Sequence, residues 1–277
     1  MRGLGDIPPA LVSPAPVSPL GGLSPRISKN SQTLSVQIDF TVGNLAASAC
    51  AITLGAVLQA STGLGAGLVV VPLLGLISLE LVPGPLIFAS LALSFLMAYL
   101  GRNSINFLNV KTLMAGLIAG MALGTLSISA IPLDRAGILF GVLVLLAVAI
   151  TAAEVRIQFT RLNLIAAGAL SGFMGATAAI GAPVLALLYQ HEESKTLRAT
   201  LGFLYFVSSI LMLAFLYAAN HFGVKELRLG LYLIPGFLAG YVLATPVARV
   251  LDRGYSRTAV LLISTVSAVV LVIKSVW

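Results

Sequence analysis

Three glycines lie within five residues of a long apolar run, and this is the first segment of the chain whose residues suggest a chemical role. They are Gly63, Gly65 and Gly67, with Pro72 a little further on. Since a glycine within a helix costs about 1 kcal/mol relative to alanine, the cluster predicts an unwound segment. The next helix then begins with free, aligned N–H groups, and such a helix start attracts anions. Pro72 fits an early position in that helix.

A second glycine cluster, later in the chain, predicts the same arrangement of an unwound segment followed by a helix start. Gly175, Thr177 and Gly181 interrupt another apolar run, and Pro183 follows them. Two converging helix starts of this kind would form a cage of N–H donors for a small anion. The alternative is that the glycines only let neighbouring helices pack closely.

Polar side chains flank both predicted breaks and could complete such a site. Hydroxyl and amide groups donate hydrogen bonds without the cost of burying a charge. The alternative is that they satisfy neighbouring backbone groups. The flanking residues are Gln59, Ser61, Thr62, Ser171, Tyr189 and Gln190.

No residue set typical of an enzyme or a proton pump accompanies these breaks. The sequence has no P-loop, HExxH or GxSxG motif, so we expect no catalytic residue and no cofactor. We also expect no metal at the short mixed-charge loop His191–Glu193. Proton-coupled pumps usually keep an acidic or histidine relay at the centre of a span. The candidates for such a relay fall near span ends instead: Glu80, Glu154, His191 and His221.

The composition places the breaks in a membrane protein. Apolar residues make up 58% of the chain and charged residues 9%, whereas a soluble domain carries about 25% charged residues. The apolar runs are continuous rather than alternating, which predicts helices and not strands. Lys and Arg account for the net charge of +7 and sit in the loops, as expected for a protein embedded in a lipid bilayer, so we expect no nucleic-acid partner. The single cysteine, Cys50, excludes an internal disulfide.

Runs of hydrophobicity divide the chain into three parts. Residues 1–38 are rich in proline and serine and lack the apolar core of a signal peptide, so we expect a disordered tail. Residues 40–153 and 164–277 each form one membrane repeat. We therefore predict an all-α polytopic membrane protein of about eight transmembrane helices in two homologous repeats, each with glycine-broken half-helices.

Two sequence markers support the duplication. Gly116 and Gly120 form a GxxxG pair followed by Leu-Asp-Arg at 133–135, and Gly236 and Gly240 repeat the spacing before Leu-Asp-Arg at 251–253. We expect the glycine pairs to be helix-packing faces. If each broken unit enters the membrane and returns, the repeats are inverted, which we favour. If each broken unit crosses once, they are parallel.

Across about residues 40–277 the sequence resembles the sulfite exporter TauE/SafE family. Leu58–Gly67 with Pro72 is similar to the first-half signature, and Leu170–Gln190 followed by Arg198-Ala199-Thr200 is similar to the second. The resemblance implies an inner-membrane permease that moves sulfur-containing anions. It assigns the family's glycine motifs to Gly63, Gly65, Gly67, Gly175, Gly181 and Pro183, and it adds Arg198 to the candidate substrate-binding residues. Ala66 and Ala182 stand where many members have glycine, which leaves the exact anion open.

The repeated glycine breaks predict a secondary transporter that works by alternating access. The resemblance implies that it lies in the cell inner membrane and exports a small sulfur-containing anion, such as sulfite or an organosulfonate. A channel-like anion pore would use the same residues, and an intramembrane enzyme is a weaker alternative. A homodimer is possible.

Overall fold

The computed structural model describes residues 42–153, 157–251 and 255–277, and within them the secondary structure is helical, without a strand. The all-α class is therefore confirmed for the described residues. The predicted tail and most of the second Leu-Asp-Arg segment lie outside these ranges. Helices of the first half are α1 (Val42–Thr62), α2 (Gly67–Ile77), α3 (Gly84–Leu100), α4 (Val110–Ala130) and α5 (Leu133–Ala152), with 3-10 turns η1 (Leu79–Leu81) and η2 (Arg102–Ser104). Those of the second half are α6 (Arg161–Ala178), α7 (Ala182–Tyr189), α8 (Ser194–Ala218), α9 (Val224–Leu251) and α10 (Tyr255–Val276).

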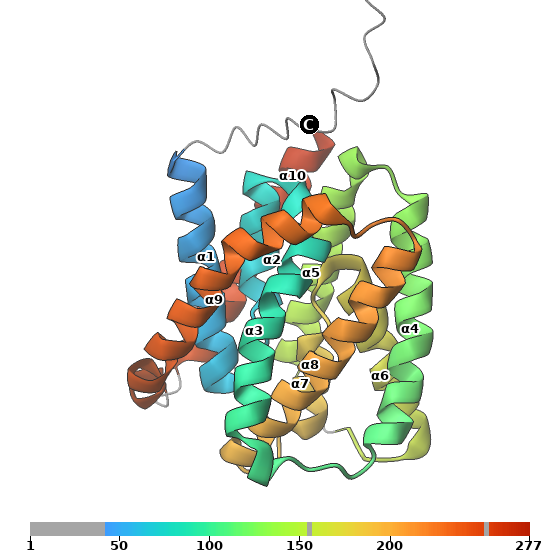
Figure 1. Ribbon diagram of the computed structural model, residues 1–277, viewed down its shortest axis with the longest axis vertical. Helices are drawn as coiled ribbons and strands as arrows, with labels where there is room; N and C mark the ends of the chain where they lie inside the picture. Colours follow the sequence, from blue (N-terminus) through green and yellow to red (C-terminus); the bar gives the residue numbers. More distant parts are fainter. Residues whose placement is uncertain (1–41, 154–156, 252–254) are drawn as a thin grey trace, which may run out of the picture. The chain divides into compact units, whose positions relative to one another are not determined.

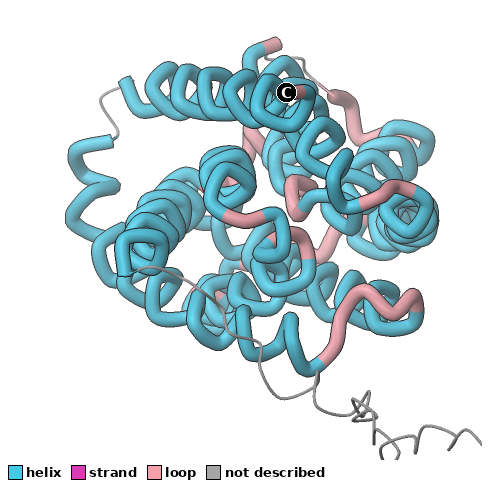
Figure 2. The backbone as a smooth tube through the Cα atoms, turned by 90° about the horizontal axis from the view of Figure 1, so that it is seen from above, coloured by secondary structure: helices cyan, strands magenta, loops and turns pink. Residues whose placement is uncertain are grey.

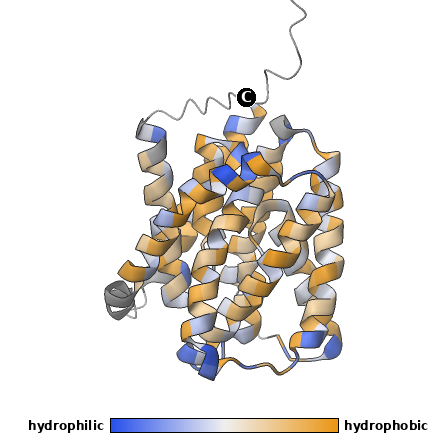
Figure 3. Ribbon diagram, in the orientation of Figure 1, coloured by the Kyte–Doolittle hydropathy of each residue, from blue (hydrophilic) through white to orange (hydrophobic). Residues whose placement is uncertain are grey.

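Apolar residues cover the middles of the helices, and hydrophilic residues gather at their two ends (Figure 3). Within the described residues, four helices are long and apolar enough to cross a bilayer. Their qualifying stretches are Val110–Ala130, Arg135–Ala152, Ser194–Ala218 and Val224–Ala244. Shorter apolar helices accompany them, so the chain is a polytopic helical membrane protein. The expected total of about eight spans stays a prediction.

Helices α4 and α6 pack closely along a stripe of glycines. A Cβ added at Gly116 would overlap the Ile165 carbonyl oxygen, and one added at Gly120 would overlap that of Ala169. Such contact between two backbones is possible only where neither helix carries a larger side chain. The expected packing role of this GxxxG pair is confirmed.

Helices α1 and α9 use the second GxxxG pair in the same manner. A Cβ at Gly240 would meet Ala56 and would lie 2.7 Å from the Thr53 carbonyl oxygen. The Thr53 hydroxyl donates to the Gly236 carbonyl oxygen at 3.3 Å. The packing role is confirmed here as well.

The helix pairs follow a pattern across the two halves of the chain, whose helices are labelled in Figure 1 and seen from above in Figure 2. Helix α4 of the first half packs on α6, the first helix of the second half, and α9 packs on α1 in return. The third helices of the halves, α3 and α8, pack together, as do the fifth, α5 and α10. This arrangement surrounds the two breaks, which follow α1 and α6.

Candidate functional site

The first break lies between α1 and α2 and is built by glycine and by Gln59. Helix α1 ends at Thr62, after which Gly63 and Gly65 adopt positive φ angles of 77° and 86°. Side chains with a Cβ rarely adopt this left-handed backbone, so the glycines permit the turn. The Gln59 amide oxygen accepts a hydrogen bond from the Ala66 N–H at 2.8 Å. Gln59 is only 5% exposed, so it satisfies a donor that water could not readily reach.

The second break is shorter than predicted. Helix α6 continues through Gly175 and Thr177 to Ala178, and the chain turns at Ala179, whose φ is 58°. The Ala179 N–H donates to the Gly175 carbonyl, and the Ile180 N–H donates to that of Met174. These bonds satisfy the last carbonyl groups of α6, as in a C-terminal helix cap whose residue has left-handed backbone angles. Alanine occupies this position, where glycine is usual.

After this cap the chain turns back along α6. The Ser171 hydroxyl donates to the Gly181 carbonyl oxygen at 2.7 Å. A Cβ at Gly181 would overlap the Ser171 carbonyl oxygen, so only glycine fits so close to α6. The start of α7 is thereby fixed against the middle of α6.

The two breaks touch each other. A Cβ at Gly65 would overlap the Ala182 side chain, and one at Gly67 would overlap the Ala179 carbonyl oxygen. The buried Tyr205 hydroxyl on α8 lies 2.8 Å from the Gly63 carbonyl oxygen and 3.2 Å from that of Ala182, and it donates to both. One hydroxyl therefore joins the first break to the second.

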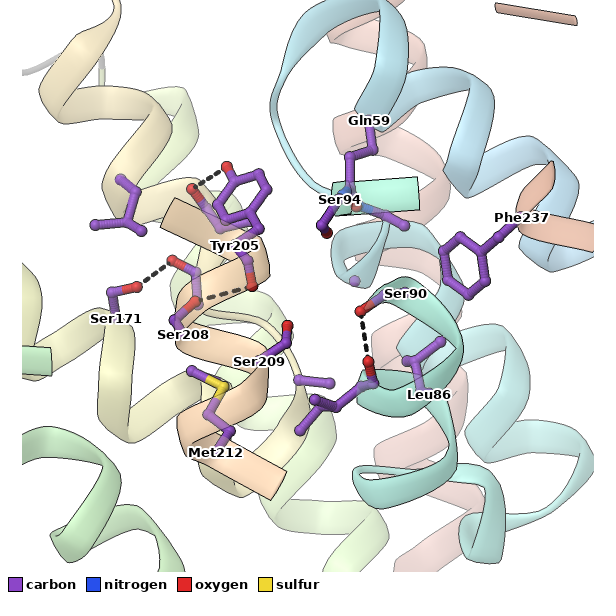
Figure 4. A pocket seen from close by; sticks show the side chains of 18 residues that line it. Gln59, Leu86, Ser90, Ser94, Ser171, Tyr205, Ser208, Ser209, Met212 and Phe237 are labelled. Carbon is purple, nitrogen blue, oxygen red and sulfur yellow. Dashed lines mark hydrogen bonds between the residues drawn. The ribbon is translucent and has the colours of Figure 1, made fainter. Parts of the chain in front are cut away.

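Beside this contact lies a cavity of about 60 Å³, which we call the central cavity (Figure 4). One water molecule needs about 10–15 Å³, so this space suits several waters or one small ion. Of the predicted site residues, Gln59, Gly67, Ser171, Gly175 and Gly181 line it. The beginnings of both α2 and α7 thus face one cavity.

Backbone donors are available at these two helix starts. The N–H groups of Val69 and Val70 both donate to the Ala66 carbonyl oxygen. The preceding amides, those of Gly67 and Leu68, have no acceptor within the helix, as at any helix start. In α7 the corresponding donors are those of Ala182 and Val184, because Pro183 between them lacks an N–H.

Hydroxyl groups provide most of the polar lining. Ser90 donates to the Ile87 carbonyl oxygen at 2.8 Å, and Ser208 donates to that of Tyr205 at 3.2 Å. The Ser94 hydroxyl differs, because it is fully buried and has no hydrogen-bond partner. Ser209, on α8, lies across the cavity from the serines of α3 (Figure 4). A buried polar group without a partner is unfavourable, so Ser94 indicates a place for a hydrogen-bonding guest.

A second cavity, about 350 Å³ in volume, holds three other predicted residues: Thr62, Pro183 and Gln190. Helix α7 separates the two spaces, since Ala182 and Leu185 line the central cavity whereas Ala186 and Leu187 line the second.

Near the second cavity, Arg198 holds the end of α1. Its guanidinium donates to the Ser61 carbonyl oxygen at 3.2 Å. The Ser61 hydroxyl itself donates to the Val57 carbonyl oxygen within α1. Both residues therefore contact the backbone near the first break and do not line the central cavity.

Three further predicted residues line neither cavity. Thr177 faces α4, where its hydroxyl bonds the carbonyl oxygens of Phe173 and Gly124. Pro72 is buried inside α2, so the prediction that it stands at an early position of this helix is wrong. Tyr189 is buried with its ring edge-on to Phe159, at 5.7 Å between centroids.

The sequence analysis missed the contribution of α3 and α8. The missed polar residues of the lining are Ser90, Ser94, Tyr205, Ser208 and Ser209. A signal was present, since Ser90 and Ser94, and likewise Tyr205 and Ser209, are four residues apart and so share one face of a helix. Hydroxyls repeated on one face of an apolar helix predict a polar contact inside a membrane protein.

Comparison with known protein families gives a match. The profile of the family described as sulfite exporter TauE/SafE matches residues 48–271 of this chain. No curated protein and no solved structure matches the chain.

Proposed function

Because the chain belongs to the sulfite exporter TauE/SafE family, we propose that it is a secondary transporter that exports sulfite or an organosulfonate across the cell inner membrane. One observation carries this proposal: the starts of α2 and α7 line one cavity together with the unpaired Ser94 hydroxyl. Free amides at two helix starts and a hydroxyl donor are groups that bind oxyanions. The family match supports the transport of a sulfur-containing anion, and the lining of the cavity supports the proposed site.

In the proposed bound state, the anion sits between the two breaks. The amides of Gly67 and Ala182 approach it from opposite breaks, and Ser94 and Ser209 donate to its remaining oxygens. Gln59 lines the cavity, and its amide oxygen holds the start of α2 in place through the Ala66 N–H. Its NH2 group is the part of the side chain that would donate to the anion.

The proposed mechanism is alternating access between two inverted repeats, residues 40–153 and 164–277. Supporting this, α1 begins at the upper end of the bundle in Figure 1 and α6 at the lower end. The exchanged pairing of α4 with α6 and of α9 with α1 is what a two-fold relation between the halves would produce. Rocking one repeat against the other would then move the walls of a fixed site.

A wall separates the central cavity from the second cavity, which favours a carrier over an open pore. It consists of α7 together with the contact between Gly65 and Ala182. The Tyr205 hydroxyl bonds both sides of this contact. In a carrier, this wall would open in the state in which the anion site is accessible from the second cavity.

The proposed export needs no buried proton relay. An anion carries its own charge, and the membrane potential provides about 2.3 kcal/mol per charge per 100 mV. In a cell with a negative interior, this energy favours movement of an anion outward.

Counterflow in proteoliposomes tests the proposal. Vesicles loaded with unlabelled sulfite or methanesulfonate should accumulate the labelled anion transiently from outside, and the rate should saturate. Gly181→Val should abolish this flux, because a side chain there would overlap Ser171. Gly43→Ala is the matched control, since no atom lies within 4 Å of a Cβ at that exposed position. Anion flux that never saturates and shows no counterflow would indicate a pore, and near-normal flux in Gly181→Val would reject the site.

A further inference from the structure

The central cavity is polar, yet its lining has no formal charge. None of its lining residues is Asp, Glu, Lys, Arg or His among the described part of the chain. Tyr205 is the one ionisable side chain in this lining among the described residues, and its hydroxyl donates to two carbonyl oxygens. Arg198, on the same helix, bonds the Ser61 carbonyl and does not line the cavity. Apart from the dipoles of its hydroxyl and amide side chains, the positive potential for an anion comes from the backbone.

Two helix starts supply that potential. The start of an α-helix acts as about half of one positive charge, because its amide dipoles are aligned. Gly67 at the start of α2 and Ala182 at the start of α7 both line the cavity. Together the two ends provide about one positive charge. A guest with one negative charge is matched, whereas a guest with two leaves one charge unmatched.

The apolar part of the cavity wall enlarges this difference. The desolvation energy of an ion grows with the square of its charge, so a dianion loses about four times as much hydration energy as a monoanion of the same size. The cavity walls include Leu86, Leu185, Met212 and Phe237. These apolar side chains offer no hydrogen bond or charge that would replace the lost hydration of a second negative charge. Neutral hydroxyls compensate only part of the loss.

The Ser94 hydroxyl fits a protonated oxyanion. It is 0% exposed and unpaired, and Figure 4 shows it among the side chains of the cavity. A serine hydroxyl donates one hydrogen bond and can accept two. It can therefore donate to an anionic oxygen or accept from an S–O–H group of the guest. A lysine or arginine in its place could only donate.

We propose that the central cavity selects singly charged oxyanions, so that hydrogensulfite and organosulfonates with one negative charge are substrates whereas the dianions sulfite and sulfate are not. The inference rests on the proposed transport function and specifies the charge state of its substrate. Transported hydrogensulfite carries its own proton through the membrane. The chain then moves one net charge and one proton per sulfite without a titrating side chain at mid-membrane.

Methanesulfonate and sulfate provide the test, because they have nearly the same shape and differ by one charge. In proteoliposomes holding the full chain, unlabelled methanesulfonate should inhibit labelled methanesulfonate uptake at least about a hundredfold more strongly than sulfate does. Equal inhibition by sulfate would overturn the inference and leave the transport function intact. No uptake of either methanesulfonate or sulfite would instead overturn the transport function.

The pH dependence gives a second, independent readout. At fixed total sulfite, uptake should follow the hydrogensulfite fraction and fall by about tenfold per pH unit once the pH exceeds the second ionisation of sulfurous acid. Methanesulfonate uptake should stay flat over the same range, which controls for titration of the protein. Sulfite uptake that rises with pH, or methanesulfonate uptake that falls in parallel, would contradict charge selection.

Two variants test the role of the lining. Ser209→Lys adds one positive charge at the cavity, so inhibition by sulfate should strengthen by at least about tenfold relative to methanesulfonate. Ser94→Ala should weaken uptake of hydrogensulfite more than that of methanesulfonate, which has no O–H to donate. Ser127→Ala is the matched control, because its hydroxyl bonds the Leu123 carbonyl oxygen within α4 and lines neither cavity. If Ser209→Lys does not fold, the wild-type comparison of the two anions still decides the inference.

Discussion

Gly65→Ala is the substitution that perturbs the meeting of the two breaks most directly. Gly65 has a φ of 86°, and a left-handed backbone costs a residue with a Cβ about 1–2 kcal/mol. The new methyl would also overlap the side chain of Ala182, and overpacking of this kind typically costs about 1–3 kcal/mol. We therefore expect a total destabilisation of about 2–5 kcal/mol, within the range that a folded protein can survive.

Flux should suffer more than folding. Relief of the overlap requires the two breaks to move apart, which shifts the helix starts that face the central cavity. A displacement of about 1 Å at a positioned site can cost about a hundredfold in rate. Sulfite flux should therefore fall by at least about tenfold while the protein remains in the membrane and elutes as a single species.

The neighbour of Gly65 allows a compensation experiment. Ala182→Gly removes the methyl group that the new side chain would meet. In the double variant the overlap energy should be recovered, whereas the left-handed backbone energy of about 1–2 kcal/mol should remain. Thermal unfolding of the detergent-solubilised protein and counterflow would measure the two effects. Wild-type stability and flux in Gly65→Ala, or no recovery in the double variant, would refute the described contact.

Further substitutions test the remaining parts of the site. Tyr205→Phe removes the hydroxyl shared by the Gly63 and Ala182 carbonyls; it should lower stability by about 0.5–1.5 kcal/mol and alter counterflow rates, and unchanged rates would exclude Tyr205 from the moving wall. Gln59→Leu leaves the buried Ala66 N–H without its acceptor; we expect a loss of about 1–3 kcal/mol in thermal unfolding and reduced flux, and full flux would show that the turn does not need this bond. Gly120→Val would drive a side chain into the Ala169 carbonyl of α6; the yield of folded protein should fall by size-exclusion chromatography, and a normal yield would contradict the close packing of α4 on α6.

Glycine position and the Gln59 side chain show how far the sequence predicts the first break. Glycine is the residue that tolerates positive φ, so the spacing of Gly63 and Gly65 predicts where the helix unwinds. An amide side chain next to unwound backbone similarly predicts a hydrogen bond to it. The structure has both features, with Gln59 bound to the Ala66 N–H.

The second break could not be located from the glycine positions. The cap residue is Ala179, and tertiary contacts hold it in a conformation that its type does not favour. Helix α6 therefore continues past Gly175. Thr177 is still part of this helix, so the helical repeat decides the direction of its side chain. Residues 175 and 177 are about 200° apart around a helix, so both cannot face one cavity. Gly175 faces the central cavity and Thr177 faces α4.

The serines of α3 and α8 could not be assigned to the site from local sequence alone. Ser94 and Ser209 lie far apart in the chain and meet only because α3 packs against α8. A hydroxyl in an apolar helix can also bond its own backbone, as Ser90 does with Ile87. The arrangement of the helices, rather than the residue types, decides which hydroxyls face the guest.

Locating a bound anion tests the central claim most directly. Hydrogenselenite is a singly charged analogue of hydrogensulfite, and its selenium gives an anomalous diffraction signal. In crystals soaked with it at mildly acidic pH, we predict a selenium peak in the central cavity, within hydrogen-bonding reach of the Gly67 and Ala182 amides and the Ser94 hydroxyl. A peak confined to the second cavity beside Gln190, or no peak under conditions where selenite blocks counterflow, would contradict the account.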